Sequence, residues 1–204
     1  MHSEYLPNSM KKNKQNGYTL VELLAVIFVL VAVGTIISSI LTSVLRSSNK
    51  SANTENVRRN GNYAISQMSK MIIYAQRLEG VSVDGIQYYT DCVSQPASTR
   101  YNYLQIKSFD GGITTFFCAN SKIASQSSAI PLQPPTGTLS YLVDPNMDAD
   151  CHFNYFNCAQ ESAAAPIKID IFLDLKATSS AIFSESQAEI PFETSVIIQN
   201  NANR

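Results

Sequence analysis

The stretch KKNKQNGYTLVELLAVIFVLVAVGTIISSIL, which runs from Lys11 to Leu41, decides the fold of the N-terminal part of the chain. A cluster of lysines precedes Gly17, and a long apolar run follows it. From Tyr18 to Leu45 this run holds 28 residues and a single charge, Glu22. Because about 20 apolar residues in a helix span a bilayer, the run predicts a transmembrane helix. An acid inside such a span is costly and indicates a functional residue.

The apolar run does not fit an ordinary secretory signal peptide. It is longer than an h-region of about 7–15 residues, and no A-x-A-like site follows it. A cut is therefore expected before the run, at the small residue Gly17, which makes residues 1–17 a cleaved basic leader. Basic residues flank both ends of the run, but the lysine cluster at the short end favours an N-terminus in the cytoplasm.

The hexapeptide Gly17–Glu22, GYTLVE, resembles the class III signal of type IV pilins and pseudopilins. That family combines a basic leader, a Gly before the cut, an aromatic residue after it and a Glu at the fifth mature position; here Tyr18 replaces the more usual Phe. The resemblance implies cleavage after Gly17 by a prepilin peptidase and N-methylation of Tyr18. It also implies that Glu22 pairs with the N-terminal amine of a neighbouring subunit and so sets the register between helices.

The helix is expected to continue beyond the membrane as an amphipathic segment over residues 46–80. Five apolar residues fall on one helical stripe: Ala64, Met68, Met71, Ala75 and Leu78. Gly80 is a natural helix stop, whereas Gly61 is a weak point that costs about 1 kcal/mol relative to Ala. The first half of the helix, residues 18–45, would then form a transmembrane or filament core, and the second half would pack on its own domain.

Residues 81–204 change to a strand-like period. Asp84-Gly85 and the segment 110–112 lie between β-prone runs and predict hairpins. Apolar residues alternate along 167–177, which predicts a half-buried strand, and 190–200 predicts a final strand. Residues 121–165 are expected to form long loops with one short strand near 138–143. The prediction is an α+β fold, a long N-terminal helix on an antiparallel sheet of about four to six strands, as in pilins.

Four cysteines, all after the apolar run, suggest disulfides formed in an oxidising compartment. They are Cys92, Cys118, Cys151 and Cys158. Three pairings are open; Cys151–Cys158 with Cys92–Cys118 is favoured, and free buried thiols are the alternative. A zinc site is disfavoured, because there is no C-x-x-C and one histidine after the leader.

Sequence signals for chemistry are weak. The chain has no G-x-S-x-G, H-E-x-x-H, P-loop or dinucleotide motif, so no enzyme activity and no cofactor are expected. A net charge of -1 gives no indication of nucleic-acid binding. Oxygen-bearing residues at alternate positions form a weak calcium candidate: Asp144, Asn146, Asp148 and Asp150. The Gly and the bidentate Glu of an EF-hand are missing, so a solvated acidic turn is the favoured interpretation.

The resemblance implies a structural subunit of a type IV pilus-like filament or a type II secretion pseudopilus. The segment FETSVIIQN loosely resembles the closing strand of minor subunits, which favours a minor pilin or pseudopilin. Implied partners are other pilin subunits, the prepilin peptidase, a platform protein and an assembly ATPase. The implied location is the inner membrane, single-pass with the C-terminal domain outside, and then the filament. The alternative is a single-pass anchored binding domain that never polymerises.

Overall fold

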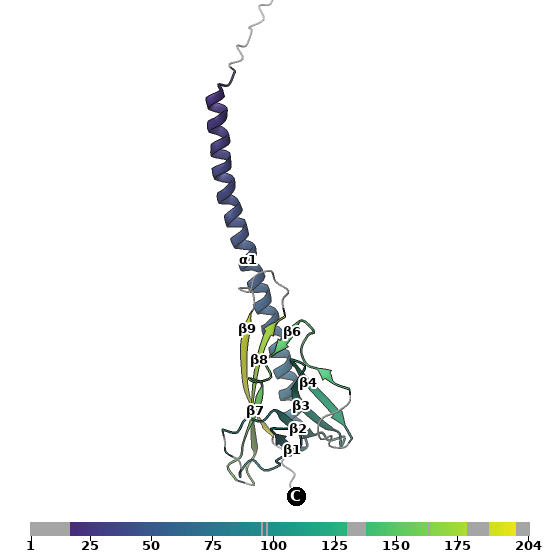
Figure 1. Cartoon of the computed structure of the whole chain (residues 1–204). Coiled ribbons are helices and arrows are strands. Elements are labelled where there is room, and N and C mark those ends of the chain that lie inside the picture. The colour runs from purple at the N-terminus through teal and green to yellow at the C-terminus, as the bar shows by residue number, and fades with distance from the viewer. Residues whose placement is uncertain are drawn as a thin grey trace, which may run out of the picture. The chain divides into compact units, whose positions relative to one another are not determined.

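A computed structural model describes residues 17–94, 96, 98–129, 138–162, 164–178 and 188–198. In this part of the chain there are one helix and nine strands (Figure 1). Helix α1 spans Leu20–Ile73, and the strands follow it. The chain divides into two compact units, residues 1–45 and 46–204, so that the boundary falls inside α1.

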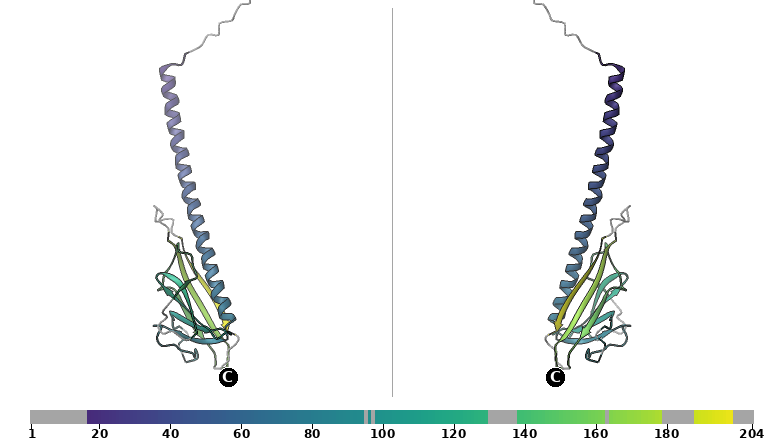
Figure 2. Two further views of the ribbon diagram at one scale, coloured as in Figure 1. Left: turned by 90° about the vertical axis from the view of Figure 1, so that its right-hand side faces the viewer. Right: turned by 90° about the vertical axis from the view of Figure 1, so that its left-hand side faces the viewer.

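Helix α1 is continuous across Gly34 and the Ser38-Ser39 pair, which interrupt the apolar run in the sequence. Its second half buries one face, made of Val57, Gly61, Ala64, Met68 and Ile72. The predicted helical stripe is thus confirmed at Ala64 and Met68, and Met71 packs at the edge of the core. Both views in Figure 2 show the strands beside this C-terminal part of α1.

The prediction that the helix runs to Gly80 is wrong. Helix α1 ends at Ile73, and strand β1 (Arg77–Ser82) begins four residues later. The backbone N–H of Gln76 already donates to the carbonyl of Lys107, at 2.7 Å, so pairing with the next strand replaces helical hydrogen bonds here. Leu78 is buried as predicted, but as a strand residue, and Gly80 follows a register shift in β1.

The first sheet has five antiparallel strands in the order β1-β2-β3-β4-β5. Strands β2 (Tyr103–Lys107) and β3 (Ile113–Ala119) form the predicted hairpin around residues 110–112. Strand β4 spans Lys122–Ser128, and the short β5 spans Ser140–Tyr141. The other predicted hairpin is a turn closed by a single bridge, in which Val81 and Tyr89 exchange backbone hydrogen bonds of 3.0 and 2.8 Å.

The turn at Asp84-Gly85 has a clear local cause. The Asp84 carboxylate accepts the backbone N–H groups of Ile86 and Gln87 at 2.9 and 3.0 Å, and these bonds lower the pKa of Asp84. Gly85 has a φ of 75°, and a Cβ there would lie 2.9 Å from the ring of Tyr103. Both the backbone conformation and the space therefore require glycine.

The second sheet is built around β8 (Ile167–Ala177). Strand β9 (Glu189–Ile198) pairs along β8, while β6 (Met147–Ala149) and β7 (Tyr155–Ala159) pair with different parts of it. The predicted alternation in β8 is confirmed: the five aliphatic residues at odd positions from Ile167 to Leu175 are all buried. The residues between them form the outer face of this sheet.

Two predictions about the β region need correction. Residues 121–165 contain more strands than predicted, because β4, β6 and β7 lie there beside the expected short strand β5. The strands also form two sheets of five and four strands instead of one. Strand β9 ends at Ile198, and residues 199–200 of the predicted final strand lie outside the described residues.

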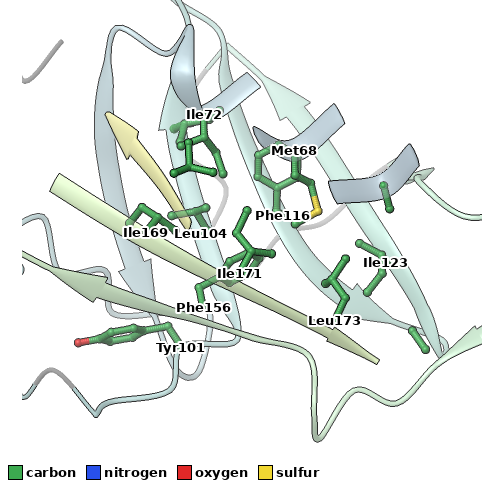
Figure 3. Packing of buried hydrophobic residues seen from close by; sticks show 14 of the residues in the cluster. Met68, Ile72, Tyr101, Leu104, Phe116, Ile123, Phe156, Ile169, Ile171 and Leu173 are labelled. Atoms are coloured by element: carbon green, nitrogen blue, oxygen red, sulfur yellow. The ribbon is translucent and has the colours of Figure 1, made fainter. Parts of the chain in front are cut away.

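One hydrophobic core joins the second half of α1 to both sheets. Figure 3 shows Met68 and Ile72 of α1 with Phe116 of β3 and Ile171 of β8 in this core. The packing at Gly61 is so close that a Cβ added there would lie 2.2 Å from the ring of Phe192 in β9. The glycine that looked like a weak point in the sequence is therefore where the ring of Phe192 packs against the helix.

Candidate functional site

The N-terminus of α1 is capped by Thr19. Gly17, Tyr18 and Thr19 precede the helix, and the backbone N–H of Glu22 donates to Thr19 Oγ1 at 3.3 Å. The pattern T-x-x-E over Thr19–Glu22 is that of a capping box, in which a Glu at the third helical position accompanies the cap. Thr19 was not among the predicted functional residues, although the T-x-x-E pattern of the sequence is a signal for it.

The position of Glu22 in the helix suits its charge. It lies in the first turn of α1, where the helix dipole favours a carboxylate. The Glu22 side chain is exposed, as is that of Tyr18. Its pairing with the amine of a neighbouring subunit stays a prediction, as do cleavage after Gly17 and methylation of Tyr18.

The first half of α1 presents an apolar surface, and its residues are exposed in the described structure. An 18-residue window of this helix reaches a mean hydropathy of 2.9 with none of its residues buried, so α1 is long and apolar enough to span a membrane. Three hydroxyl groups are satisfied inside the helix: Thr35, Ser39 and Thr42 each donate at 2.8 Å to a carbonyl three or four residues earlier. Such bonds reduce the cost of polar residues in a hydrocarbon environment.

These features indicate an α+β protein whose N-terminal helix suits membrane anchoring. A family model described as the prokaryotic N-terminal methylation motif matches residues 12–44. This match supports the resemblance of residues 17–22 to the signal of type IV pilins and pseudopilins. The motif implies processing by prepilin peptidase and assembly with other pilin-type subunits. Neither a curated protein nor a solved structure matches the chain.

The cysteines are paired differently from the favoured prediction. The disulfides are Cys92–Cys158 and Cys118–Cys151, with Cα–Cα distances of 5.6 and 5.4 Å. Cys118 belongs to β3 of the first sheet, and Cys158 belongs to β7 of the second. The short spacing along the chain favoured a bond between Cys151 and Cys158. The fold instead places Cys151 beside Cys118 and Cys158 beside Cys92. The alternative of free buried thiols is wrong.

The calcium candidate is held together by protein groups. Asp144 and Asp150 each accept the backbone N–H two residues further along, at 2.9 and 3.0 Å. The Lys122 ammonium lies 3.3 Å from Asp148 Oδ1 and donates to the carbonyl of Pro145 at 2.6 Å. A lysine thus supplies the positive charge that a metal would bring to Asp148. In the described residues there is no group of three or more His, Cys, Asp or Glu side chains placed to hold a metal.

His152, the one histidine after the leader, is exposed in the turn between Asp150 and Asn154. Its backbone N–H donates to Asp150. The structure thus gives His152 a place in a turn stabilised by main-chain bonds. That the chain is not an enzyme stays a prediction.

Proposed function

We propose that the chain is a minor pilin or pseudopilin, a structural subunit of a type IV pilus-like filament or secretion pseudopilus. The observation that carries the proposal is the first half of α1, which combines the matched motif with an uninterrupted, uncovered apolar surface. A soluble domain would bury such a surface against itself. In the proposed assembly, other subunits or lipid would cover it.

Assembly would depend on an ion pair between subunits. Cleavage after Gly17 leaves an ammonium on Tyr18, and the family pattern places Glu22 of a neighbour opposite it. In a low-dielectric environment each charge offsets part of the desolvation cost of the other. Because a single stagger of two helices brings the groups together, the pair would set the axial register of the filament.

The proposed location is the inner membrane, with residues 46–204 on the extracytoplasmic side before assembly. The two disulfides support this, since disulfides persist in oxidising compartments. A platform protein and an assembly ATPase would move the subunit from membrane to filament. The resemblance of strand β9 to the closing strand of minor subunits, through Phe192, Thr194 and Val196, supports a minor subunit.

The processing step can be tested directly. In cells with an active prepilin peptidase, mass spectrometry is expected to find a mature chain that begins at methylated Tyr18. Cells without the peptidase should contain the intact leader. A chain that begins at Met1 in both strains would rule out the pilin function and leave the non-polymerising membrane-anchored binding domain.

Replacing Glu22 tests the assembly step. Glu22→Ala is expected to lower incorporation into sheared filaments or pseudopili by at least about tenfold, because it leaves a buried ammonium without its partner. Immunoblotting of the sheared fraction against the membrane fraction gives the ratio. Glu55→Ala is the matched control, since Glu55 lies on the same helix and makes an exposed pair with Arg59.

Glu22→Gln separates the two roles of this residue. Glutamine can replace glutamate in a capping box but carries no charge. If the ion pair between subunits drives assembly, Gln should fail as Ala does. Normal assembly with Gln and loss with Ala would instead assign the residue to helix capping.

A further inference from the structure

The outer face of the second sheet carries a hollow with a volume of about 280 Å³. Eight residues line it: Phe153, Tyr155, Phe172, Leu173, Asp174, Pro191, Phe192 and Glu193. Strand pairing explains why they meet. Tyr155, Phe172 and Glu193 are directly opposite one another across β7, β8 and β9, and Asp174 is opposite Pro191 in the adjacent row.

Aromatic rings form one wall of the hollow. Tyr155 and Phe172 are stacked with ring centroids 4.5 Å apart and an interplanar angle of 17°. Phe153 is 57% exposed at the rim. The Arg100 guanidinium already lies over the ring of Tyr155, with its Cζ 4.5 Å from the centroid. Phe172 and Arg100 thus cover the two faces of Tyr155, and the rings left for a bound cation are those of Phe172 and Phe153, whose faces attract cations as ring faces do.

The hollow also has acidic residues in its lining. Asp174 and Glu193 line it, and no lysine or arginine does. Asp174 Oδ1 is buried and receives no hydrogen bond. Burial is the main cause that raises the pKa of Asp174, with further contributions from Glu189 and Asp150, while Lys176 acts in the opposite direction. A positive charge in the hollow would stabilise this desolvated carboxylate.

We propose that this hollow binds the lysine or arginine side chain of a partner protein. Aromatic faces and carboxylates together select an organic cation. The volume lies just below the range of about 300–1,000 Å³ for small-molecule sites, so it suits one side chain better than a whole metabolite. An aromatic anchor site with an exposed aromatic rim is also typical of protein interfaces. The proposal does not depend on polymerisation of the chain.

The test uses the full chain in nonionic detergent micelles and a blocked Gly-Lys-Gly peptide as the probe. In an NMR titration the lysine methylene protons are expected to shift upfield and to saturate, because they enter the shielding region of the rings. A matched peptide with norleucine in place of lysine keeps the apolar stem without the charge and should not bind. Equal binding of both peptides would overturn the proposal, as would saturable binding of a methyl glycoside in preference to lysine.

Two variants locate the binding. Phe153→Ala and Glu193→Gln are each expected to weaken lysine-peptide binding by about two- to fivefold, the effect of one cation–π or charge contact at an exposed site. Phe109→Ala and Glu161→Gln are the matched controls, because both residues are exposed and neither lines the hollow. Unchanged binding in both hollow variants, with a normal circular dichroism spectrum, would contradict the assignment.

Discussion

Replacing Cys92 and Cys158 together with serine is expected to lower the free energy of unfolding by about 3 to 4 kcal/mol. The disulfide joins residues 66 apart, and the second disulfide, 33 apart, is nested inside that loop. About half of the outer loop is therefore already bypassed, and closing a loop of this remaining length gives the stated value in the chain-entropy estimate. Urea unfolding of the oxidised full chain in micelles, followed by tyrosine fluorescence, measures the change.

The second disulfide, Cys118–Cys151, provides a control for this experiment. Removing Cys118 and Cys151 opens a loop of nearly the same effective length, so the two double substitutions should cost similar amounts. Peptide mapping of the non-reduced chain must show the surviving disulfide. In the wild-type chain, a peptide linking Cys92 to Cys118 would contradict the disulfide pairing of the structure. So would a much smaller loss of stability for one of the two double substitutions.

Gly61→Ala is expected to destabilise the domain by about 1 to 2 kcal/mol, although alanine is the better helix former. The added methyl group would lie between 2.2 and 2.5 Å from three atoms at the far end of the Phe192 ring. Overpacking of this kind costs about 1–3 kcal/mol, which exceeds the gain of about 1 kcal/mol in helix propensity. Urea unfolding of the full chain gives the sign of the change, which is the decisive observation.

A second substitution shows whether the ring is the cause. Leucine at position 192 ends before the ring atoms that clash, so Gly61→Ala with Phe192→Leu should recover part of the loss that Gly61→Ala alone produces. Gly34→Ala is the control for helix propensity, because nothing lies within 4 Å of a Cβ there. A Gly61→Ala chain more stable than the wild type would show that α1 and β9 are not packed this closely.

The parts of the fold that could be predicted were those written locally in the sequence. The apolar run after Gly17 predicted the first half of α1, and strict alternation predicted β8, because burial on one face imposes that pattern. The turn residues at 110–112 predicted the hairpin between β2 and β3. The helix end was placed too late because the spacing of Leu78 suits both a helix and a strand.

The missed parts depend on contacts distant in sequence. Strand β4, with the sequence KIASQSS, has little hydrophobic pattern and owes its burial to its neighbours β3 and β5. The turn before it, Asn120-Ser121, has φ values of 53° and 54°, and its asparagine was a usable hairpin signal. The disulfide pairing and the role of Gly61 could not be derived, because both require knowing which strands lie together.

The same distinction applies to the sites. GYTLVE could be interpreted from its own residues. The structure adds that Thr19 caps the N-terminus of α1, three residues before Glu22. The hollow on the second sheet had no sequence signal, since Tyr155, Phe172 and Glu193 come from three strands. Only the register between those strands brings the rings and carboxylates together.

The nested disulfides also determine how the domain would respond to a pulling force. A filament subunit carries tension that enters through its N-terminal helix. The Cys92–Cys158 bond is a covalent cross-link between residues 66 apart, and force transmitted through it bypasses the segment that contains β2 to β6. Because Cys118–Cys151 already bypasses half of this segment, the remainder could otherwise extend by roughly 110–120 Å at about 3.3–3.6 Å per residue. With the bond intact, force can unfold the terminal segments of a subunit but cannot extend the segment between the two cysteines. A filament built from such subunits would therefore resist lengthening under load.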